Sequence, residues 1–170
     1  MCDSQVVIVP IKVEDTIPLR HSVLWPEREV SYVSLPEDNE GYHFGAFLPS
    51  QRRDTPICII SLFLAAIPRT EVDDSPSNAE HHTGAARFRK FACHPVYQRR
   101  GIGTKLLEHV FSVAFSELGV TVIWCDARVT SIDWYKKRGM TSSGGIFRKD
   151  GLEYIRMQKS IDQMTVLDIN

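Results

Sequence analysis

The chain has 170 residues, the length of about one domain at ~100 to 200 residues per domain. Its 20 basic and 21 acidic residues give a formal net charge of -1, which excludes a polybasic protein that meets its partner through overall charge. Hydrophobic residues make up 43% of the chain, enough to form a core without disulfide or metal support.

The cysteines and the N-terminus indicate a reduced, cytoplasmic protein. No CxxC or CxxH spacing joins the four cysteines, Cys2, Cys58, Cys93 and Cys125, so we expect neither a zinc ribbon nor a disulfide framework. The apolar run Val6–Val9 lacks a preceding basic segment, and a signal peptide is not expected. The longest apolar stretch, Ile57–Ile67, is too short to cross a bilayer, so no membrane partner is expected.

The first half of the chain predicts a strand, a helix and two further strands. Gln5–Val13 is β-branched and apolar, as in a strand, and the next segment has helix signals from Asp15 to Pro26. Tyr42–Leu48 and Pro56–Ala66 are typical of neighbouring strands in a buried sheet. Pro68–Thr83 is polar, rich in acids and without periodicity, which predicts a solvent-exposed loop.

The middle of the chain predicts two parallel strands joined by a helix. Ala86–Cys93 is a strand pattern, and apolar residues then recur at helical spacing from Gly101 until Gly119, a helix-ending residue. Val120–Cys125 is a short, very apolar strand. A strand, helix, strand order predicts a right-handed crossover between parallel strands.

The last part predicts a short helix and a hairpin. Thr130–Asp133 has the pattern of a capping box, and Gly139 is expected to end the helix that it starts. Asp150-Gly151 lies between two strand patterns, the strongest local signal for a β-hairpin. Ile161–Asn170 is expected to be a tail.

A local excess of positive charge indicates an anion-binding segment. Six basic residues and no acid lie between Arg87 and Lys105, a local excess that favours contact with an anion. At its centre, Gln98–Thr104 is a glycine-containing turn between a predicted strand and a predicted helix. The first turn of a helix has N–H groups without intrahelical partners, and glycine allows close approach of a phosphate. We therefore expect this turn to bind a pyrophosphate.

Two common phosphate-binding motifs do not fit this turn. Gly103-Thr104-Lys105 lacks the order and the first glycine of a Walker A loop. A dinucleotide-binding fingerprint needs a third glycine where Leu106 stands, although Asp126 falls near the place of its acidic residue.

Two segments together resemble motifs of the GNAT superfamily of N-acetyltransferases. Phe91–Leu107 is similar to its acetyl-CoA-binding motif, with the core [RQ]-x-x-G-x-[GA], and Ser131–Met140 is similar to its A-x-x-[FL]-Y-x-x-x-G-F helix. The resemblance implies an α/β domain of the α+β type over residues 1–160 and a tail over 161–170. Its central mixed, mostly antiparallel sheet would carry helices on both faces and a crevice between two splayed parallel strands.

The resemblance also implies which residues bind acetyl-CoA and which act on it. The strand before the loop would hold the pantetheine arm and polarise the thioester carbonyl, the loop amides would bind the pyrophosphate, and Tyr135 would protonate the leaving thiolate. The implied cofactor-binding residues are Phe91, Ala92, Cys93, Gln98, Arg99, Arg100, Gly101, Ile102, Gly103, Thr104 and Ser131.

The position where many family members carry the general base differs in this sequence. The acid that many members carry before the loop is near Arg87 here, and arginine cannot act as a base. Asp126, after the strand that ends at Cys125, is the best carboxylate candidate because such strand ends open onto the ligand crevice. The next candidates lie on the polar loop: Glu80, His81 and His82. The family's usual asparagine is replaced by Arg128.

These features predict an N-acetyltransferase that moves acetyl from acetyl-CoA to a primary amine of a small molecule or peptide in a ternary complex. We expect a monomer or homodimer, with no metal and no nucleic acid. Two alternatives remain: a non-catalytic CoA-binding regulatory module, favoured by the missing acid at Arg87, and a nucleic-acid-binding protein that uses Arg87–Lys105.

The acceptor amine is left open by the sequence. Arg87, Arg89 and Arg128 favour an acidic or phosphorylated small molecule, whereas the acidic segment Glu71–Glu80 favours a polyamine or a lysine-bearing peptide.

Overall fold

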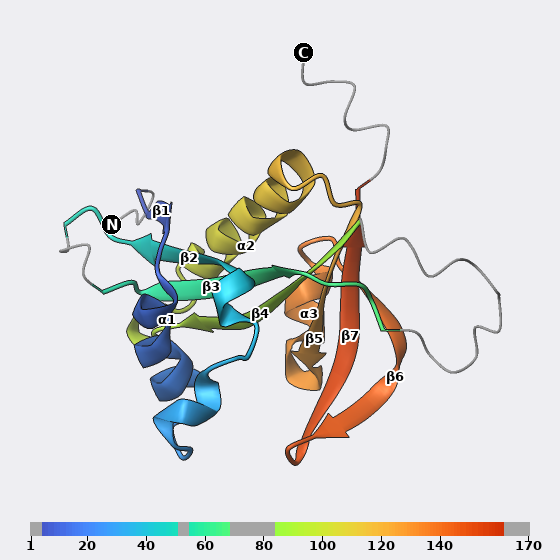
Figure 1. Cartoon of the computed structure of the whole chain (residues 1–170), viewed down its shortest axis with the longest axis horizontal. Helices are drawn as coiled ribbons and strands as arrows, with labels where there is room; N and C mark the ends of the chain where they lie inside the picture. Colours follow the sequence, from blue (N-terminus) through green and yellow to red (C-terminus); the bar gives the residue numbers. More distant parts are fainter. Residues whose placement is uncertain (1–4, 51–54, 69–83, 162–170) are drawn as a thin grey trace. The chain divides into compact units, whose positions relative to one another are not determined.

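The computed structural model describes residues 5–50, 55–68 and 84–161, which contain seven strands and three α-helices (Figure 1). The strands are β1 (Val7–Pro10), β2 (Tyr42–Phe47), β3 (Cys58–Leu64), β4 (Ala85–Cys93), β5 (Val122–Arg128), β6 (Thr141–Lys149) and β7 (Leu152–Ser160). The helices are α1 (Val13–Leu19), α2 (Ile102–Ser112) and α3 (Ile132–Lys136).

The strands form a mixed sheet with the order β1-β2-β3-β4-β5-β7-β6. The pairs β1–β2, β2–β3, β5–β7 and β6–β7 are antiparallel, whereas β4 and β5 are parallel. The predicted mixed, mostly antiparallel α/β sheet is therefore confirmed, as is the parallel pair joined through α2.

The chain forms two compact units, each built from two segments. The N-terminal unit comprises Met1–Phe63 and Phe88–Ser112, and the C-terminal unit comprises Leu64–Arg87 and Val113–Asn170. The predicted crevice between β4 and β5 concerns both units and stays a prediction, as do the domain limits 1–160 and 161–170.

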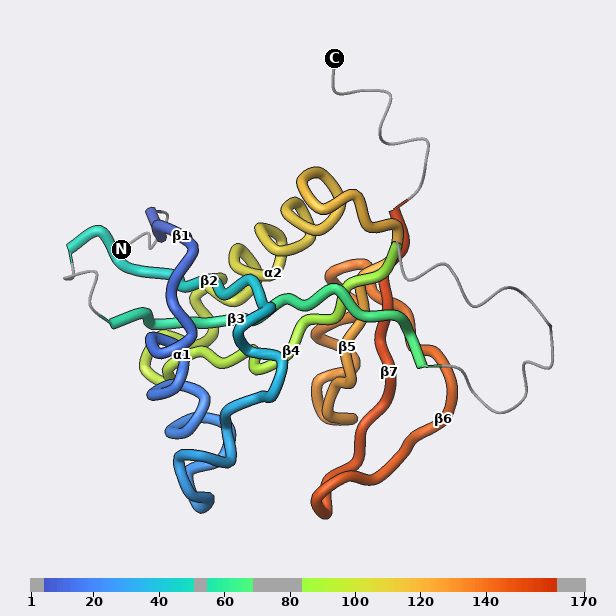
Figure 2. Tube along the Cα trace, viewed as in Figure 1, coloured from blue at the N-terminus to red at the C-terminus, as the bar shows by residue number. Residues whose placement is uncertain are grey.

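In the N-terminal unit, α1 and α2 cover opposite faces of the sheet (Figure 1). Ile59 of β3 packs with Leu19 of α1. The neighbouring residue Ile60 pairs with Phe44, whose ring lies 5.2 Å from His109 of α2. Successive side chains of a strand point to opposite faces, so the two helices bury both sides of β2 and β3. Figure 2 follows the chain through these strands.

A buried ion pair fixes the segment between α1 and β2. Arg20, in the π-helical turn Arg20–Leu24, is fully buried and donates to both carboxylate oxygens of Asp38 at 2.8 Å. It also donates to Val33 O at 3.1 Å and to Ser61 Oγ at 2.9 Å. Desolvation opposes ionisation of Asp38, but the hydrogen bonds from Arg20 and the Leu35 N–H lower its pKa. One arginine thus joins α1, the 33–38 segment and β3.

His43 extends this network through both of its ring nitrogens. Its Nε2 lies 2.8 Å from Asp38 O, which can only accept, so Nε2 carries the proton. Its Nδ1 lies 2.7 Å from Ser61 Oγ. Because Ser61 Oγ also accepts from Arg20, it links the arginine to the His43 ring. Every hydroxyl and ring nitrogen of this buried chain therefore has a partner.

In the C-terminal unit, β5, β7 and β6 form an antiparallel sheet with α3 on one face (Figure 1). Lys159 Nζ of β7 donates to Arg138 O, just after α3, at 3.2 Å. The β6–β7 turn has φ of 51° at Asp150 and 78° at Gly151, so the predicted Asp-Gly hairpin is confirmed.

Three sequence-based expectations were wrong. Helix α1 begins at Val13, because Asp15 is its third residue and accepts from the Lys12 N–H at 3.1 Å, and Pro18 lies inside the helix. No side-chain hydrogen bond caps α3, so the expected capping box of Thr130–Asp133 is absent. Strand β5 continues to Arg128 through its ladder with β7, which places Asp126 within the strand.

Other expectations concern residues beyond the described parts of the chain. Most of the expected loop, residues 69–83, and most of the expected tail, residues 162–170, lie outside the described residues. Within the described parts, no helix is long and apolar enough to span a membrane.

We predict that Arg20→Met lowers the free energy of unfolding by about 3–5 kcal/mol, because it leaves the Asp38 carboxylate buried without its cation. Urea denaturation measures this change. The matched control is Arg148→Met, since the Arg148 and Glu153 side chains are 75% and 48% exposed. It should cost no more than about 1 kcal/mol. Equal losses for the two variants would contradict the role assigned to Arg20.

Candidate active site

The end of β4 contains a backbone irregularity next to the predicted pantetheine-binding residues. Lys90 has φ of 54°, unusual for a residue with a side chain. Arg89 pairs with Glu37, beside the buried Asp38, and Ala92 packs with Leu19 and Ile59. Side chains three positions apart therefore reach the same side of the strand, which regular alternation does not allow. A bulge of this kind re-aims backbone groups, here immediately before Phe91, Ala92 and Cys93.

The Cys93 side chain borders a buried thiol. The hydrogen bond with Cys93, followed by burial, raises the pKa of Cys58, which stays protonated at neutral pH. Cys58 is fully buried and Cys93 is half-buried. The same hydrogen bond lowers the pKa of Cys93, although partial burial opposes this shift.

The turn between β4 and α2 has the backbone form expected of an anion-binding loop. Gln98 Nε2 donates to Cys93 O at 2.9 Å and so ties the turn to the end of β4. Positive φ values follow at Arg99 (61°) and Gly101 (79°). The Lys105 N–H donates to Gly101 O at 3.1 Å, and the amides of Ile102 and Gly103, earlier in this turn, have no intrahelical acceptor.

Two further features favour anion binding by this turn: the open space beside Gly101 and the burial of Ile102. A Cβ placed on Gly101 would meet no atom within 4 Å, so the backbone there is open to a ligand. Ile102 is 1% exposed and anchors the first turn of α2 in the core. Arg99 and Arg100 are exposed, and Arg100 lies 5.5 Å above the Tyr97 ring. Thr104 is the third residue of α2 and is half-buried.

The second motif forms the short helix α3 and positions Tyr135. Ser131 precedes the helix, and the Tyr135 ring meets the Trp134 ring edge-to-face at 5.1 Å. Burial, together with the nearby Cys125, raises the pKa of Tyr135 well above its ordinary value, although Arg138 opposes the shift. Tyr135 therefore holds its proton throughout the neutral range.

Asp126 is held by two arginines. Its Oδ2 accepts from Arg87 Nη2 at 2.9 Å, and its Oδ1 accepts from Arg156 Nε at 3.0 Å. Alternation along β5 directs Asp126 to one face and Cys125, the neighbour of Tyr135, to the other. The structure thus does not bring the two predicted catalytic side chains together, and the geometry favours an ion-pair role for Asp126.

Sequence reasoning missed two partners of the charged residues it selected. Arg156 pairs with Asp126 from β7, and Glu37 pairs with Arg89 from the segment before β2. The Asp-Gly turn predicts the β6–β7 register, but no local signal predicts that β7 lies beside β5. Of the other candidates for the base, Glu80, His81 and His82 lie outside the described residues.

Comparison with known proteins defines the class. Residues 25–140 match the model of the acetyltransferase (GNAT) family. The chain is 29% identical over 154 residues to YitI, an uncharacterized N-acetyltransferase of Bacillus subtilis (strain 168), covering 89% of this chain and 93% of YitI. This chain therefore belongs to the acetyltransferase (GNAT) family, and it is an acyltransferase.

Solved structures share the fold. A candidate N-acetyltransferase of Lactobacillus plantarum has a TM-score of 0.71 at 20% identity, with 92% of this chain and 99% of that chain covered. A GNAT family acetyltransferase of Elizabethkingia anophelis, solved with acetyl-CoA bound, has a TM-score of 0.61 at 15% identity, with 93% and 99% covered. The predicted GNAT-like fold is confirmed.

We predict that Gly103→Glu abolishes CoA binding and leaves the fold intact. A carboxylate in the first turn of α2 repels a pyrophosphate there, yet it favours the helix itself by about 0.3–1 kcal/mol. Calorimetric titration with CoA and thermal melting measure the two effects. Gly103→Gln is the matched control, with nearly the same shape and no charge, and it should bind CoA more tightly than Gly103→Glu. Unchanged CoA affinity in Gly103→Glu would remove the loop from the binding site.

Proposed function

We propose that this acyltransferase moves an acetyl group from acetyl-CoA to a primary amine while both substrates are bound. The observation that carries the proposal is the first turn of α2, where the amides of Ile102 and Gly103 have no intrahelical acceptor and follow an open, positive-φ glycine. Such a turn recognises a diphosphate through backbone N–H groups and the positive end of the helix dipole.

The residues around this turn fit the acidic half of CoA. The amides from Arg99 to Thr104 bind the diphosphate, while Arg99 and Arg100 are exposed beside them and add attraction at long range. Gln98 fixes the turn through its bond to Cys93 O, and Ser131 contributes to the cofactor site from the second motif. Phe91, Ala92 and Cys93 hold the pantetheine arm.

Acetyl-CoA supplies a thioester whose carbonyl carbon is open to attack by a neutral amine. An N–H near Ala92 or Cys93, after the bulge at Lys90, donates to the thioester oxygen as negative charge develops there. When both substrates are bound in one complex, the amine attacks a thioester that is already held in position beside it. Positioning and polarisation therefore provide most of the rate enhancement.

Tyr135 acts on the leaving group. The amine nitrogen bonds to the carbonyl carbon, the carbon–sulfur bond breaks, and the phenol proton moves to the sulfur. Because the Tyr135 pKa is raised, the phenol is present in its protonated form whenever acetyl-CoA binds at neutral pH. Solvent then returns a proton to Tyr135 and takes one from the acetylated nitrogen.

The predicted role of Asp126 as general base stays a prediction that its surroundings disfavour. Both carboxylate oxygens already accept hydrogen bonds from arginine. An amine that enters in its neutral form needs no base before attack, so Asp126 is not required for the bond-forming step.

A turnover assay with a panel of amines tests the proposal. The chain is mixed with acetyl-CoA and one amine at a time, while thiol release and the mass of the amine are followed. We expect thiol release to match formation of an amine heavier by one acetyl group. Tight CoA binding with no turnover on any amine would favour a non-catalytic CoA-binding module instead.

We predict that Tyr135→Phe lowers kcat by about 10²–10⁴-fold and preserves acetyl-CoA affinity, because one hydroxyl is lost and the ring remains. Steady-state kinetics and a CoA titration measure these effects. Tyr154→Phe, on β7, removes a hydroxyl outside the motif and is the control. In the wild type, the raised pKa keeps the Tyr135 phenol protonated up to at least pH ~10. Ionisation of Tyr135 should therefore cause no fall in kcat between neutral pH and pH ~10. An undiminished kcat in Tyr135→Phe, with chemistry rate-limiting, would make Tyr135 a packing residue.

A further inference from the structure

Several arginines lie on one face of the C-terminal unit. They belong neither to the Gln98–Thr104 turn nor to the helix that carries Tyr135. The strand registers place Arg87 beside Trp124, and Asp126 beside Arg156. Paired residues share a face, and so do residues two apart on β5, which adds Arg128. Trp124, Asp126 and Arg128 and the residues paired with them across β4, β7 and β6 include four charged side chains: Arg87, Asp126, Arg128 and Arg156. Arginine stays protonated in proteins, so this face carries an excess of positive charge.

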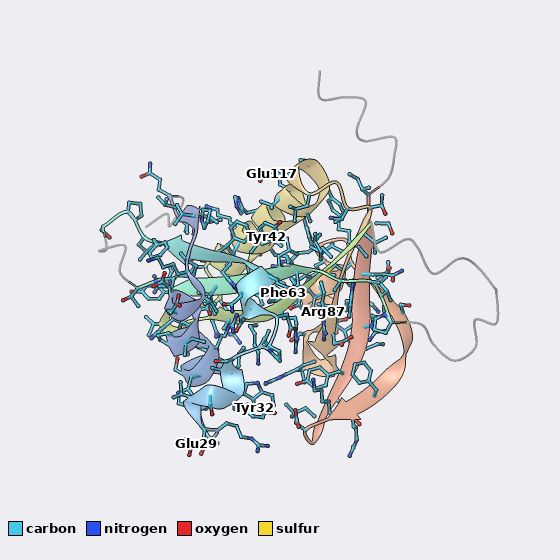
Figure 3. All side chains as sticks on the ribbon, in the orientation of Figure 1. Glu29, Tyr32, Tyr42, Phe63, Arg87 and Glu117 are labelled. Carbon is cyan, nitrogen blue, oxygen red and sulfur yellow. The ribbon has the colours of Figure 1, made fainter. Side chains whose placement is uncertain are left out.

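The indole ring of Trp124 packs against the guanidinium groups of Arg87 and Arg156. Trp124 is 2% exposed, and its Nε1 donates to Ala65 O at 2.9 Å, which fixes the indole plane. The guanidinium carbons of Arg87 and Arg156 lie 4.7 and 4.8 Å from the centre of the indole ring. Both distances fall within the range of cation–π attraction. Arg87 is labelled in Figure 3.

Asp126 orients the two guanidinium groups. Each of its oxygens accepts one hydrogen bond, from Arg87 Nη2 and from Arg156 Nε. The three side chains are only 17–23% exposed, so the pair is restrained more than two surface arginines would be. One carboxylate cannot balance two guanidinium charges, and the cluster remains positive.

Arg156 retains its terminal donors for a further acceptor. It uses Nε for Asp126, and among the described residues no hydrogen bond is made by its Nη1 or Nη2. The guanidinium fork matches two oxygens of a carboxylate or phosphate group. A preorganised fork of this kind loses little side-chain entropy when an anion binds.

We infer that Arg156, held by Asp126 over Trp124 and accompanied by Arg87, binds the anionic group of the acceptor amine. The acceptor class is therefore an amine that also carries a carboxylate or a phosphate, not a polyamine. This inference rests on the proposed acetyl transfer for its biological meaning, but the anion site itself can be measured without turnover. Asp126 is then a positioning residue for the arginines.

Pairs of amines that differ by one anionic group test this site. Tyrosine and tyramine differ by a carboxylate, phosphoethanolamine and ethanolamine differ by a phosphate, and spermidine represents the polyamines. Binding of each compound is measured by calorimetry without acetyl-CoA, and kcat/KM is measured with it. The proteins are the wild type, Arg156→Met, Arg156→Lys and the control Arg148→Met, which alters an exposed arginine of the β6–β7 hairpin. Thermal melting verifies that each variant is folded.

We expect the wild type to bind at least one anionic member about 10- to 100-fold more tightly than its neutral partner, as charge-assisted bonds allow. Arg156→Met should remove this preference, and Arg156→Lys should reduce it several-fold because lysine lacks the fork. Arg148→Met should keep it. The carboxylate and phosphate pairs then identify the anion.

The other outcomes separate the two proposals. Acetylation of neutral amines or spermidine with no preference for an anionic partner would overturn the anion site and leave acetyl transfer standing. A preference that survives both Arg156 variants would also overturn it. Binding of an anionic amine that depends on Arg156, without turnover of any amine, would support the site and contradict the proposed function. If Arg156→Met does not fold, the Arg156→Lys comparison decides.

Discussion

The N–H groups in the first turn of a helix have no acceptor within that helix. In this chain, the first turn of α2 follows directly after β4 and a turn with positive φ. Ile102 buries its side chain and holds the turn in place, while Gly101 leaves the approach to the backbone open. Gln98 ties the turn to the last carbonyl of β4. The proposed diphosphate site and the proposed position of the thioester on β4 both depend on this short segment.

Charged residues have two different roles in this chain. Arg20 and Asp38 are buried, joined by two hydrogen bonds and linked to Ser61 and His43, so their charges hold the fold of the N-terminal unit. Arg156 is restrained through Nε and keeps its outer nitrogens available. The first arrangement stabilises the fold, whereas the second has the geometry of the proposed anion site.

The parts of the molecule that sequence predicted well depend on local physics. The turn at Gln98–Thr104, the Asp-Gly hairpin and the parallel strands around α2 follow from glycine positions, helical spacing and chain order. The missed features are pairings across long sequence distances. Asp126 was expected at a strand end because apolar residues stop at Cys125, but pairing with β7 extends β5 to Arg128. The partnership of Asp126 with Arg156 depends on the same register, which no local pattern specifies.

The most direct test of the account is a crystal structure of the chain with acetyl-CoA. The account predicts diphosphate oxygens within hydrogen-bond distance of the first-turn amides of α2, the thioester oxygen facing an amide at the end of β4, and the Tyr135 hydroxyl next to the sulfur. A diphosphate held elsewhere, with the amides of Ile102 and Gly103 left to solvent, would contradict it.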